Sequence, residues 1–303
     1  MMIIKILLNG YNGRMGRMFT QIASKYPDIK IVAGMDVVPA QVDAYSVKPD
    51  YPVFITGATS DAVSVSAGSA TSSNSTGSAA SPGTSTSPAA PDVNPAELAS
   101  VDFDVLVDFS HPSMLSTILS LAVSRSKPVV LATTGYSDAQ IDEIAAAAAK
   151  IPVFKTANMS IGINLMTELI KTAAALLADN FDIELVESHH NQKLDAPSGT
   201  ALMLADAMKN TLSGELEYVY DRHNVRAKRG KKELGIHSIR GGTNVGEHSV
   251  IFAGNDEVLE IKHSASSRGI FAEGAVRAVR FITEDGRTPG LYSMQNLLLD
   301  NAE

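Results

Sequence analysis

The run Ile3-Ile-Lys-Ile-Leu-Leu-Asn-Gly-Tyr-Asn-Gly-Arg-Met-Gly16 decides the fold of this chain of 303 residues. Its largely apolar first half predicts a buried strand, and Gly10, Gly13 and Gly16 follow in the spacing G-x-x-G-x-x-G. Glycine permits a tight turn, close approach of the backbone to a pyrophosphate, and close packing of a helix on a strand. We therefore expect the opening of a dinucleotide-binding fold. The spacing is one residue off the usual fingerprint, and a glycine loop without a ligand is the alternative.

The residues after the glycine turn supply the context that this motif requires. Apolar residues at helical spacing come next, and a second strand over residues 29–35 ends at Asp36. A carboxylate at that position binds the ribose hydroxyls of an adenosine and repels a 2′-phosphate, which favours NADH as the cofactor. Arg14 and Arg17 lie in or beside the turn and could reach a 2′-phosphate, so NADPH is the alternative.

The first half of the chain alternates strands with helices. Strands are predicted over residues 105–109, 128–132 and 153–155, with helices between them. This order predicts an α/β fold with a doubly wound parallel sheet of the Rossmann type. An open parallel sheet binds its ligand at the carboxyl ends of its strands. The turns found there, Phe109-Ser110 and Thr133-Thr134, are therefore expected to line the cofactor.

The pattern changes in the second half, which predicts a second α/β domain with a mixed open sheet. Longer alternating strands are expected over residues 235–240, 247–253 and 258–263. A final amphipathic helix over residues 271–282 is expected to return to the first domain. The border between the domains is placed near Ser160.

These patterns divide the chain into two predicted domains and one insertion. Residues 1–159 and 269–303 form the dinucleotide-binding domain, and residues 160–268 form the domain that carries the substrate. Within the first domain, 26 of the 28 residues over 64–91 are Ser, Thr, Ala, Gly or Pro, and none is charged or aromatic. Such a composition cannot build a core, so we expect a disordered and functionally neutral insertion, with a modification or partner site on the repeated Ser and Thr as the alternative.

A second informative stretch is Glu187-Ser-His-His-Asn-Gln-Lys-Leu-Asp-Ala-Pro-Ser-Gly-Thr-Ala201. The preceding strand is expected to end at about Val186, so that His189 and His190 lie at its end. The Ser-Gly-Thr segment at 198–200 then begins a helix, whose free N–H groups bind a carboxylate or phosphate. Lys193 adds a positive charge, and a histidine exchanges a proton near neutral pH. The stretch predicts an anion site with acid and base groups attached.

Two plainer interpretations of this stretch exist. Ser-Gly-Thr before an apolar helix is also an ordinary helix cap. A metal site would need a third ligand from His237, His248 or His263, but these histidines show no metal-type spacing and the chain has no cysteine. We therefore predict no bound metal.

Charge and composition exclude several classes of function. The chain has 25 Lys and Arg against 33 Asp and Glu, a net charge of −8, which argues against nucleic acid or an anionic membrane as the main partner. Without cysteine there is neither a disulfide framework nor a thiol nucleophile. The N-terminus enters a strand without a signal-peptide pattern, and no apolar run approaches a membrane span. We expect a cytoplasmic enzyme that meets a small anion through local charges.

Five segments, taken in order along the chain, resemble the dihydrodipicolinate reductase family, whose members are also called 4-hydroxy-tetrahydrodipicolinate reductases. They are residues 10–16, 133–135, 157–162, 187–201 and 263–268, and the resemblance extends over nearly everything except the insertion. It implies a Rossmann domain completed by the C-terminal segment, a second domain that also builds a homotetramer, an NAD(P)H cofactor and a small dicarboxylate substrate. The implied reaction is the reductive loss of water from a cyclic dicarboxylate in diaminopimelate and lysine biosynthesis.

The family pattern also implies roles for individual residues. His189 would donate the proton, and Lys193 would neutralise charge and assist protonation. The implied substrate-binding residues are His190, Ser198, Gly199 and Thr200. The residues expected at the cofactor, from the patterns above and from the family together, are Gly10, Asn12, Gly13, Arg14, Met15, Gly16, Asp36, Phe109, Ser110, Ala132, Thr133, Thr134, Ala157, Asn158, Met159 and Arg268.

Two positions depart from the family pattern, and two other functions are compatible with the sequence. The family often has an aromatic residue at the position of Met159 and a glycine at that of Ala132, and both departures touch cofactor packing. A related NAD(P)H-dependent reductase of another small oxo- or imino-acid would share the cofactor half and differ in the pocket. A non-catalytic nicotinamide-binding protein would keep the glycine turn, but it would have no need of the acid, base and anion groups near residue 190.

Overall fold

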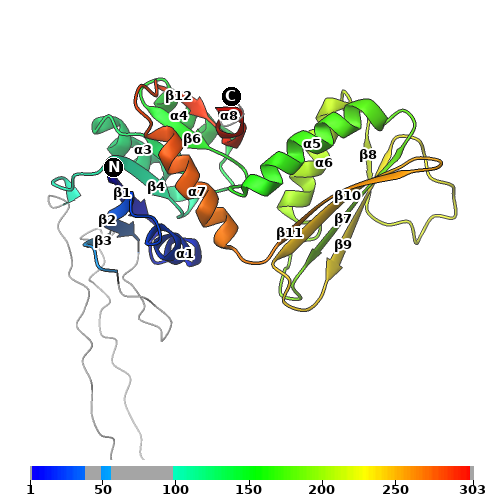
Figure 1. Ribbon diagram of the computed structural model, residues 1–303, viewed down its shortest axis with the longest axis horizontal. Coiled ribbons are helices and arrows are strands. Elements are labelled where there is room, and N and C mark those ends of the chain that lie inside the picture. The colour runs from blue at the N-terminus through cyan, green and yellow to red at the C-terminus, as the bar shows by residue number, and fades with distance from the viewer. Residues whose placement is uncertain (1, 38–48, 56–97, 301–303) are drawn as a thin grey trace, which may run out of the picture.

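The computed structural model describes residues 2–37, 49–55 and 98–300, which form two β-sheets with their covering helices (Figure 1). The predicted insertion at 64–91 lies outside the described residues. Figure 1 shows the first sheet on the left and the second on the right. Two segments join these parts: the turn before α5 (Ile161–Leu177) and the connection between β11 (Val258–Ala265) and α7 (Gly269–Ile282).

The first sheet has seven strands in the order β12-β6-β5-β4-β1-β2-β3, and every neighbouring pair is parallel. The strand order reverses beside β1, which pairs with β2 on one side and with β4 on the other. Such a reversal opens a ligand crevice at the carboxyl ends of the strands. The predicted doubly wound parallel sheet is confirmed. Its strands are β1 (Ile4–Asn9), β2 (Ile29–Asp36), β3 (Val53–Ile55), β4 (Val105–Asp108), β5 (Val129–Leu131), β6 (Pro152–Lys155) and β12 (Gly290–Tyr292).

Helices cover both faces of this sheet, because successive side chains of a strand point to opposite faces. Along β1, Ile6 and Leu8 belong to the core beneath α1 and α7, whereas Leu7 belongs to the core beneath α3 and α4. All three side chains are fully buried. The bounds are α1 (Arg14–Ala23), η1 (Pro112–Met114), which is a single 3-10 turn, α3 (Leu115–Ser124) and α4 (Asp138–Ala148).

The second sheet has five strands in the order β11-β10-β7-β9-β8 and is mixed, as predicted. β10 runs antiparallel to both of its neighbours, while β7, β9 and β8 run parallel. α5 and α6 pack together over one face, where Ile170, Leu185 and Leu204 are completely buried. The remaining bounds are β7 (Asp182–His189), α6 (Gly199–Thr211), β8 (Glu217–Val219), β9 (Glu233–Arg240) and β10 (Gly246–Ala253).

The strand β7 is longer than the sequence predicted. Its expected end was near Val186, but pairing with β9 and β10 continues to Ser188 and His189. Hydrogen bonding from two neighbouring strands keeps these polar residues extended, which a pattern of apolar residues does not reveal. Buried and half-buried side chains alternate along the whole strand, so His189 shares the buried face with Glu187.

The chain returns to the first sheet through α7, which packs against α1. The Arg280 guanidinium contacts both carboxylate oxygens of Asp28 at 2.8 Å, and the hydroxyl of Tyr26 donates to Glu273. The prediction that this helix is the last element is wrong, because β12 and α8 (Met294–Asp300) follow it. β12 adds an edge strand beside β6. Its three residues are too few to show a period-2 pattern in the sequence.

Candidate active site

The glycine turn after β1 is closely packed. Gly10 has a φ of +77°, and a Cβ at this position would lie 2.7 Å from the backbone carbon of Phe109. A Cβ on Gly16 would lie 2.1 Å from the carbonyl oxygen of Gly10, so the start of α1 packs directly against the turn. Gly13 is the N-cap of α1 and offers no side-chain acceptor. The first-turn N–H groups of the helix are therefore left to an anion.

The ends of β1 and β4 are tied together beside this turn. The side chain of Asn9 donates to Asp108 and to the Ser110 hydroxyl, each at 2.8 Å. The Ser110 hydroxyl in turn donates to Asp108 at 2.6 Å. Asp108 is fully buried, and Phe109 packs against Phe19 with the rings tilted and their centroids 5.5 Å apart. Ser110 thus helps to join the carboxyl ends of β1 and β4, while Phe109 packs against α1.

Asp36 is held beside the glycine turn at the end of β2. Its carboxylate accepts from the backbone N–H of Asn12 at 3.1 Å and from that of Val37 at 2.8 Å. The Arg17 guanidinium donates to the side-chain oxygen of Asn12 at 2.8 Å. Arg14 is exposed at the first position of α1, and the following Met15 is half-buried. A carboxylate and two arginines therefore surround the region that the sequence assigned to an adenosine.

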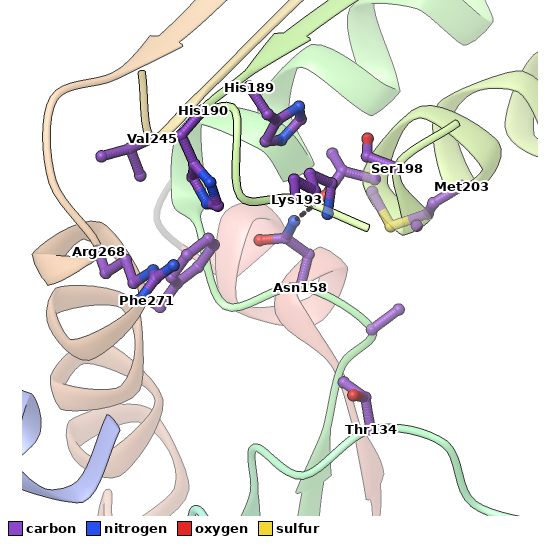
Figure 2. A pocket seen from close by; sticks show the side chains of 13 residues that line it. Thr134, Asn158, His189, His190, Lys193, Ser198, Met203, Val245, Arg268 and Phe271 are labelled. Atoms are coloured by element: carbon purple, nitrogen blue, oxygen red, sulfur yellow. Dashed lines mark hydrogen bonds between the residues drawn. The ribbon is translucent and has the colours of Figure 1, made fainter. Parts of the chain in front are cut away.

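A cavity of about 380 Å³ lies between the two sheets, and Figure 2 shows His189 and His190 across it from Thr134. The first sheet contributes its carboxyl edge, and the second contributes the end of β7, the following loop and the first turn of α6. All six residues assigned to catalysis or substrate line the cavity, and so do four assigned to the cofactor. The lining residues are Thr134, Ala157, Asn158, His189, His190, Lys193, Ser198, Gly199, Thr200, Met203, Val245, Arg268 and Phe271.

The other residues expected at the cofactor lie outside this cavity. The glycine turn and Asp36 lie at the neighbouring strand ends, while Thr133 is buried after β5. Met159 is 4% exposed and belongs to the core of the first sheet, and Ala132 packs against that core. The two departures from the family pattern are therefore contacts with the core of the first sheet rather than residues that line the cavity.

The carboxylate of Glu187 lies at the centre of the hydrogen bonds on the substrate side. The side chain is completely buried and receives two hydrogen bonds from Arg240, at 2.7 and 2.8 Å. The backbone N–H of Ser198 donates to it at 3.1 Å, and His189 Nδ1 lies 2.5 Å from its second oxygen. Burial alone would raise the pKa of Glu187, but hydrogen bonds from Arg240, Ser238 and His189 outweigh it and hold the pKa at about 2.

Two imidazoles lie beside this carboxylate. Burial lowers the pKa of His189, while the hydrogen bond and the charge of Glu187 act in the opposite direction. The His248 ring meets that of His189 edge to face, with centroids 5.2 Å apart, and its Nε2 lies 3.0 Å from the Ser198 hydroxyl. Burial lowers the pKa of His248 to about 4, so this ring is neutral at neutral pH.

The first turn of α6 borders the cavity through Gly199 and Thr200. Ser198 is the N-cap, and its hydroxyl accepts from the N–H of Ala201 at 3.1 Å. The side-chain amide of Asn158 donates to the Thr200 hydroxyl at 3.0 Å, which joins the first sheet's edge to this turn (Figure 2). That hydroxyl keeps its own proton for another acceptor. The arrangement suits a carboxylate, which accepts from N–H and O–H donors.

Positive charge lines the cavity on two sides. The Lys193 ammonium lies 2.9 Å from the carboxylate of Asp195, and this hydrogen bond lowers the pKa of Asp195. Arg268 begins α7 on the opposite side of the cavity (Figure 2). A second anionic group of the same ligand would meet one of these cations.

Sequence reasoning missed several side chains at this site. Met203, Val245 and Phe271 line the cavity. Arg240 and His248 do not line it but form hydrogen bonds with Glu187 and Ser198, respectively. The position of Glu187 two residues before His189 signals that the two share a face. No sequence signal marked Arg240 or His248, because their partners lie 53 and 50 residues away.

Within residues 2–37, 49–55 and 98–300, no three His, Cys, Asp or Glu side chains are grouped so as to hold a metal ion. In the same ranges, no helix combines the length and the apolar character needed to span a bilayer.

Comparison with known proteins identifies the family. Two family models described as dihydrodipicolinate reductase, N-terminus and C-terminus, match residues 4–63 with 55–159 and residues 162–298. The 4-hydroxy-tetrahydrodipicolinate reductase of Clostridium tetani is 40% identical over 98% of both chains. That of Caldanaerobacter subterraneus subsp. tengcongensis is 39% identical over 98% of this chain and 99% of its own.

A solved structure shares the fold. Dipicolinate-bound dihydrodipicolinate reductase from Paenisporosarcina sp. TG-14 superimposes with a TM-score of 0.70 at 21% identity, covering 97% of this chain and 99% of that one. With both family models matched and relatives near 40% identity over the full length, the chain belongs to the dihydrodipicolinate reductase family.

Proposed function

We propose that the protein catalyses the NAD(P)H-dependent reduction of 4-hydroxy-tetrahydrodipicolinate to tetrahydrodipicolinate, with loss of water, in diaminopimelate and lysine biosynthesis. In this reaction the substrate, a hydride and a proton give the product and one water. The single observation that carries the proposal is the cavity itself. It brings His189, Lys193 and the first turn of α6 opposite Thr134 and Asn158 at the carboxyl edge of a dinucleotide-binding sheet.

The residues at the carboxyl edge of the first sheet fit a nicotinamide dinucleotide. The turn leaves no room for a side chain at Gly10 or Gly16, and Gly13, the N-cap of α1, offers no side-chain acceptor to the first N–H groups of the helix, as a pyrophosphate site requires. When bound, the reduced cofactor supplies the hydride. Thr134, Ala157 and Asn158 from this edge, together with Arg268 at the N-cap of α7, line the cavity and are proposed to position the nicotinamide end.

The residues of the second sheet are proposed to hold a dicarboxylate and to supply the proton. One carboxylate would accept from the N–H groups of Gly199 and Thr200 and from the Thr200 hydroxyl, and Lys193 would offset its charge. His190 would contact the same ligand. His189, held with Nδ1 against Glu187, would donate a proton from Nε2 as the reduction proceeds. Negative charge that develops on the ring would be stabilised by Lys193.

We also propose that NADH is preferred over NADPH. The support is Asp36, whose carboxylate is fixed beside the glycine turn by the N–H groups of Asn12 and Val37. A fixed negative charge there favours two ribose hydroxyls over a 2′-phosphate. Arg17 bonds to Asn12 and Arg14 is exposed nearby, so use of NADPH at a lower rate is expected.

We further propose that residues 1–159 and 269–303 carry the cofactor, and that residues 160–268 carry the substrate and build a homotetramer. The second sheet supports the assembly, because it leaves apolar side chains exposed: Ile239 at 53%, Val258 at 65% and Leu259 at 42%. Light scattering coupled to size-exclusion chromatography should give a mass of four chains. A monomer at micromolar concentration would contradict the assembly.

The test of the function is a coupled assay. The unstable substrate would be generated by the upstream synthase, and oxidation of NADH and of NADPH would be followed in parallel by absorbance. Turnover that depends on the synthase supports the proposal, and faster turnover with NADH supports the preference. A screen of other small oxo- and imino-acids tests whether the protein is a reductase of a different substrate. Oxidation of NADH with one of those and not with the synthase product would show a different reductase, and binding without any turnover would show a non-catalytic protein.

A further inference from the structure

The buried carboxylate of Glu187 joins two groups that the proposed reaction needs. His189 and Glu187 lie on the same face of β7, and the N-cap of α6 approaches them from the side. Arg240, at the end of β9, holds the carboxylate with two hydrogen bonds of 2.7 and 2.8 Å. The same guanidinium donates to the carbonyl of Asp195 at 2.6 Å, so the loop that carries Lys193 is attached to this cluster as well.

The chemistry of this contact determines where the proton of His189 resides. An ionised carboxylate only accepts hydrogen bonds, so Nδ1, at 2.5 Å, must carry a hydrogen in both charge states of the ring. Nε2 is then the one nitrogen that gains or loses a proton. A Cβ on Gly246 would lie 2.9 Å from this atom, so Nε2 faces a residue that has no side chain to cover it. His189 itself lines the cavity.

We propose that Glu187 is a positioning residue that fixes the Nδ1-H tautomer of His189, directs Nε2 to the substrate, and holds the N-terminal turn of α6 in place through Ser198. This role rests on the proposed function and does not require Glu187 to touch the substrate. A single carboxylate thus sets the geometry of the proton donor and of the anion-binding turn together.

The charged surroundings of His189 define what loss of this carboxylate would do. Glu187 from its own strand, Arg240 from β9, His248 from β10 and Lys193 from the loop all approach the ring. Of these groups, Glu187 raises the pKa of His189 and so stabilises the protonated ring, while Lys193 and Arg240 lower this pKa. Removing the negative charge leaves only opposing influences, so a smaller fraction of His189 would be protonated at neutral pH.

The matched pair of variants is Glu187→Gln and Glu184→Gln. Glu184 lies on the same strand but on the opposite face, and it too contacts an arginine and a histidine, Arg229 at 3.1 Å and His237 at 2.8 Å. Both changes remove one charge from a partly or fully buried ion-pair cluster on β7. Only the first touches the proposed proton donor.

The first measurement uses the full chain without substrate. Long-range proton–nitrogen correlation spectra of protein labelled with ¹⁵N-histidine, at about pH 8, report the imidazole tautomer. The His189 signals are assigned by their loss in His189→Gln. Wild type and Glu184→Gln should show the Nδ1-H form, and Glu187→Gln should lose this preference. A wild-type His189 in the Nε2-H form would overturn the proposal, even if Glu187→Gln does not fold.

The second measurement is the pH profile of kcat. Glu187→Gln should lower kcat by about 10- to 100-fold, the range found for carboxylates that orient metal-bound histidines through the same kind of hydrogen bond. The limb of the profile that reports protonated His189 should move to lower pH, and Glu184→Gln should change neither. An unmoved limb, or an equal loss in both variants, would overturn the role. Absence of turnover by wild type would refute the proposed function instead, because the tautomer is measured without substrate.

Discussion

The two halves of the site are built by different forces. The glycine turn of the first sheet is held by close backbone packing, with a Cβ on Gly16 excluded at 2.1 Å from Gly10. The junction of β7 and α6 is held by charge, with Glu187 completely buried among four hydrogen bonds. The glycine turn has no room for added side chains, whereas the junction of β7 and α6 is held by hydrogen bonds to a charged side chain.

This difference follows from what each half is proposed to bind. A pyrophosphate is recognised by backbone N–H groups, so its site needs space and a fixed turn rather than ionisable side chains. A reacting dicarboxylate needs a proton donor and fixed positive charge, and buried ionic groups are stable only when fully paired. Substitutions should therefore act through shape in the first half and through charge and protonation in the second.

The largest effect is expected from His189→Gln on the charged half. Loss of a general acid typically lowers the rate by ~10² to 10⁴, so kcat should fall within that range while binding of NADH is retained. Steady-state kinetics together with fluorescence titration of NADH would measure both quantities. His223→Gln, at an exposed position, is the control. Near-native turnover of His189→Gln would refute its assignment as the proton donor.

The next effect is expected from Gly16→Ala on the closely packed half. The added methyl would meet the Gly10 carbonyl oxygen at 2.1 Å, and overpacking of this kind should cost about 3 kcal/mol of stability. Urea denaturation followed by circular dichroism would give the free energy of unfolding, and the affinity for NADH should fall with it. Gly241→Ala is the matched control, because nothing lies within 4 Å of its added Cβ. Equal losses of stability and of NADH affinity in the two variants would show that close packing does not determine the structure of this half.

A third effect concerns the pH dependence of stability in the charged half. The pKa of His248 is about 4 in the folded protein, against 6.5 for an unhindered histidine. Below pH 6.5 the unfolded chain binds the proton more readily, so stability is lost as the pH falls toward 4, by at most about 3 kcal/mol for this group.

Replacement of His248 should flatten that acid dependence. The pKa values of His189 and His263 are also lowered by burial, so His248→Asn should remove only part of the loss. Urea midpoints measured from about pH 7 to about pH 4 would show how much of the acid-induced loss of stability is due to His248. His223→Asn should leave the dependence of stability on pH unchanged. If the stability of His248→Asn falls with pH as steeply as that of wild type, this ring is not kept neutral by burial.

The smallest effect is expected at Asp36. Asp36→Ser should shift the ratio of kcat/KM for NADH over NADPH toward NADPH by about tenfold, or ~1.4 kcal/mol, because the charge that repels a 2′-phosphate is lost. Asp50→Ser, an exposed carboxylate near β3, is the control. A wild-type enzyme that strongly prefers NADPH would contradict the interpretation of Asp36.

Elements with local signals were predicted well. The glycine turn, the individual buried strands of the first sheet and the helix that begins after Ser198 each depend on residues within a few positions of one another. β12 was missed because an edge strand of three residues has no periodicity, and β7 was cut short because its last residues are polar. In both cases pairing with neighbouring strands, rather than local preference, decides the structure.

The sequence by itself determined that Gly10, Gly13 and Gly16 form a turn between strand and helix, and that His189, Lys193 and Thr200 lie within one short stretch. Only the tertiary structure decided that the second stretch borders one cavity with Thr134 and Asn158 from the first sheet, whose carboxyl edge also carries the glycine turn. It also decided that Arg240 contacts Glu187 and that His248 contacts Ser198. The reason is physical. Local motifs are encoded by side-chain size and backbone preference, whereas contacts across 50 or 53 residues depend on strand register, which the whole sheet determines.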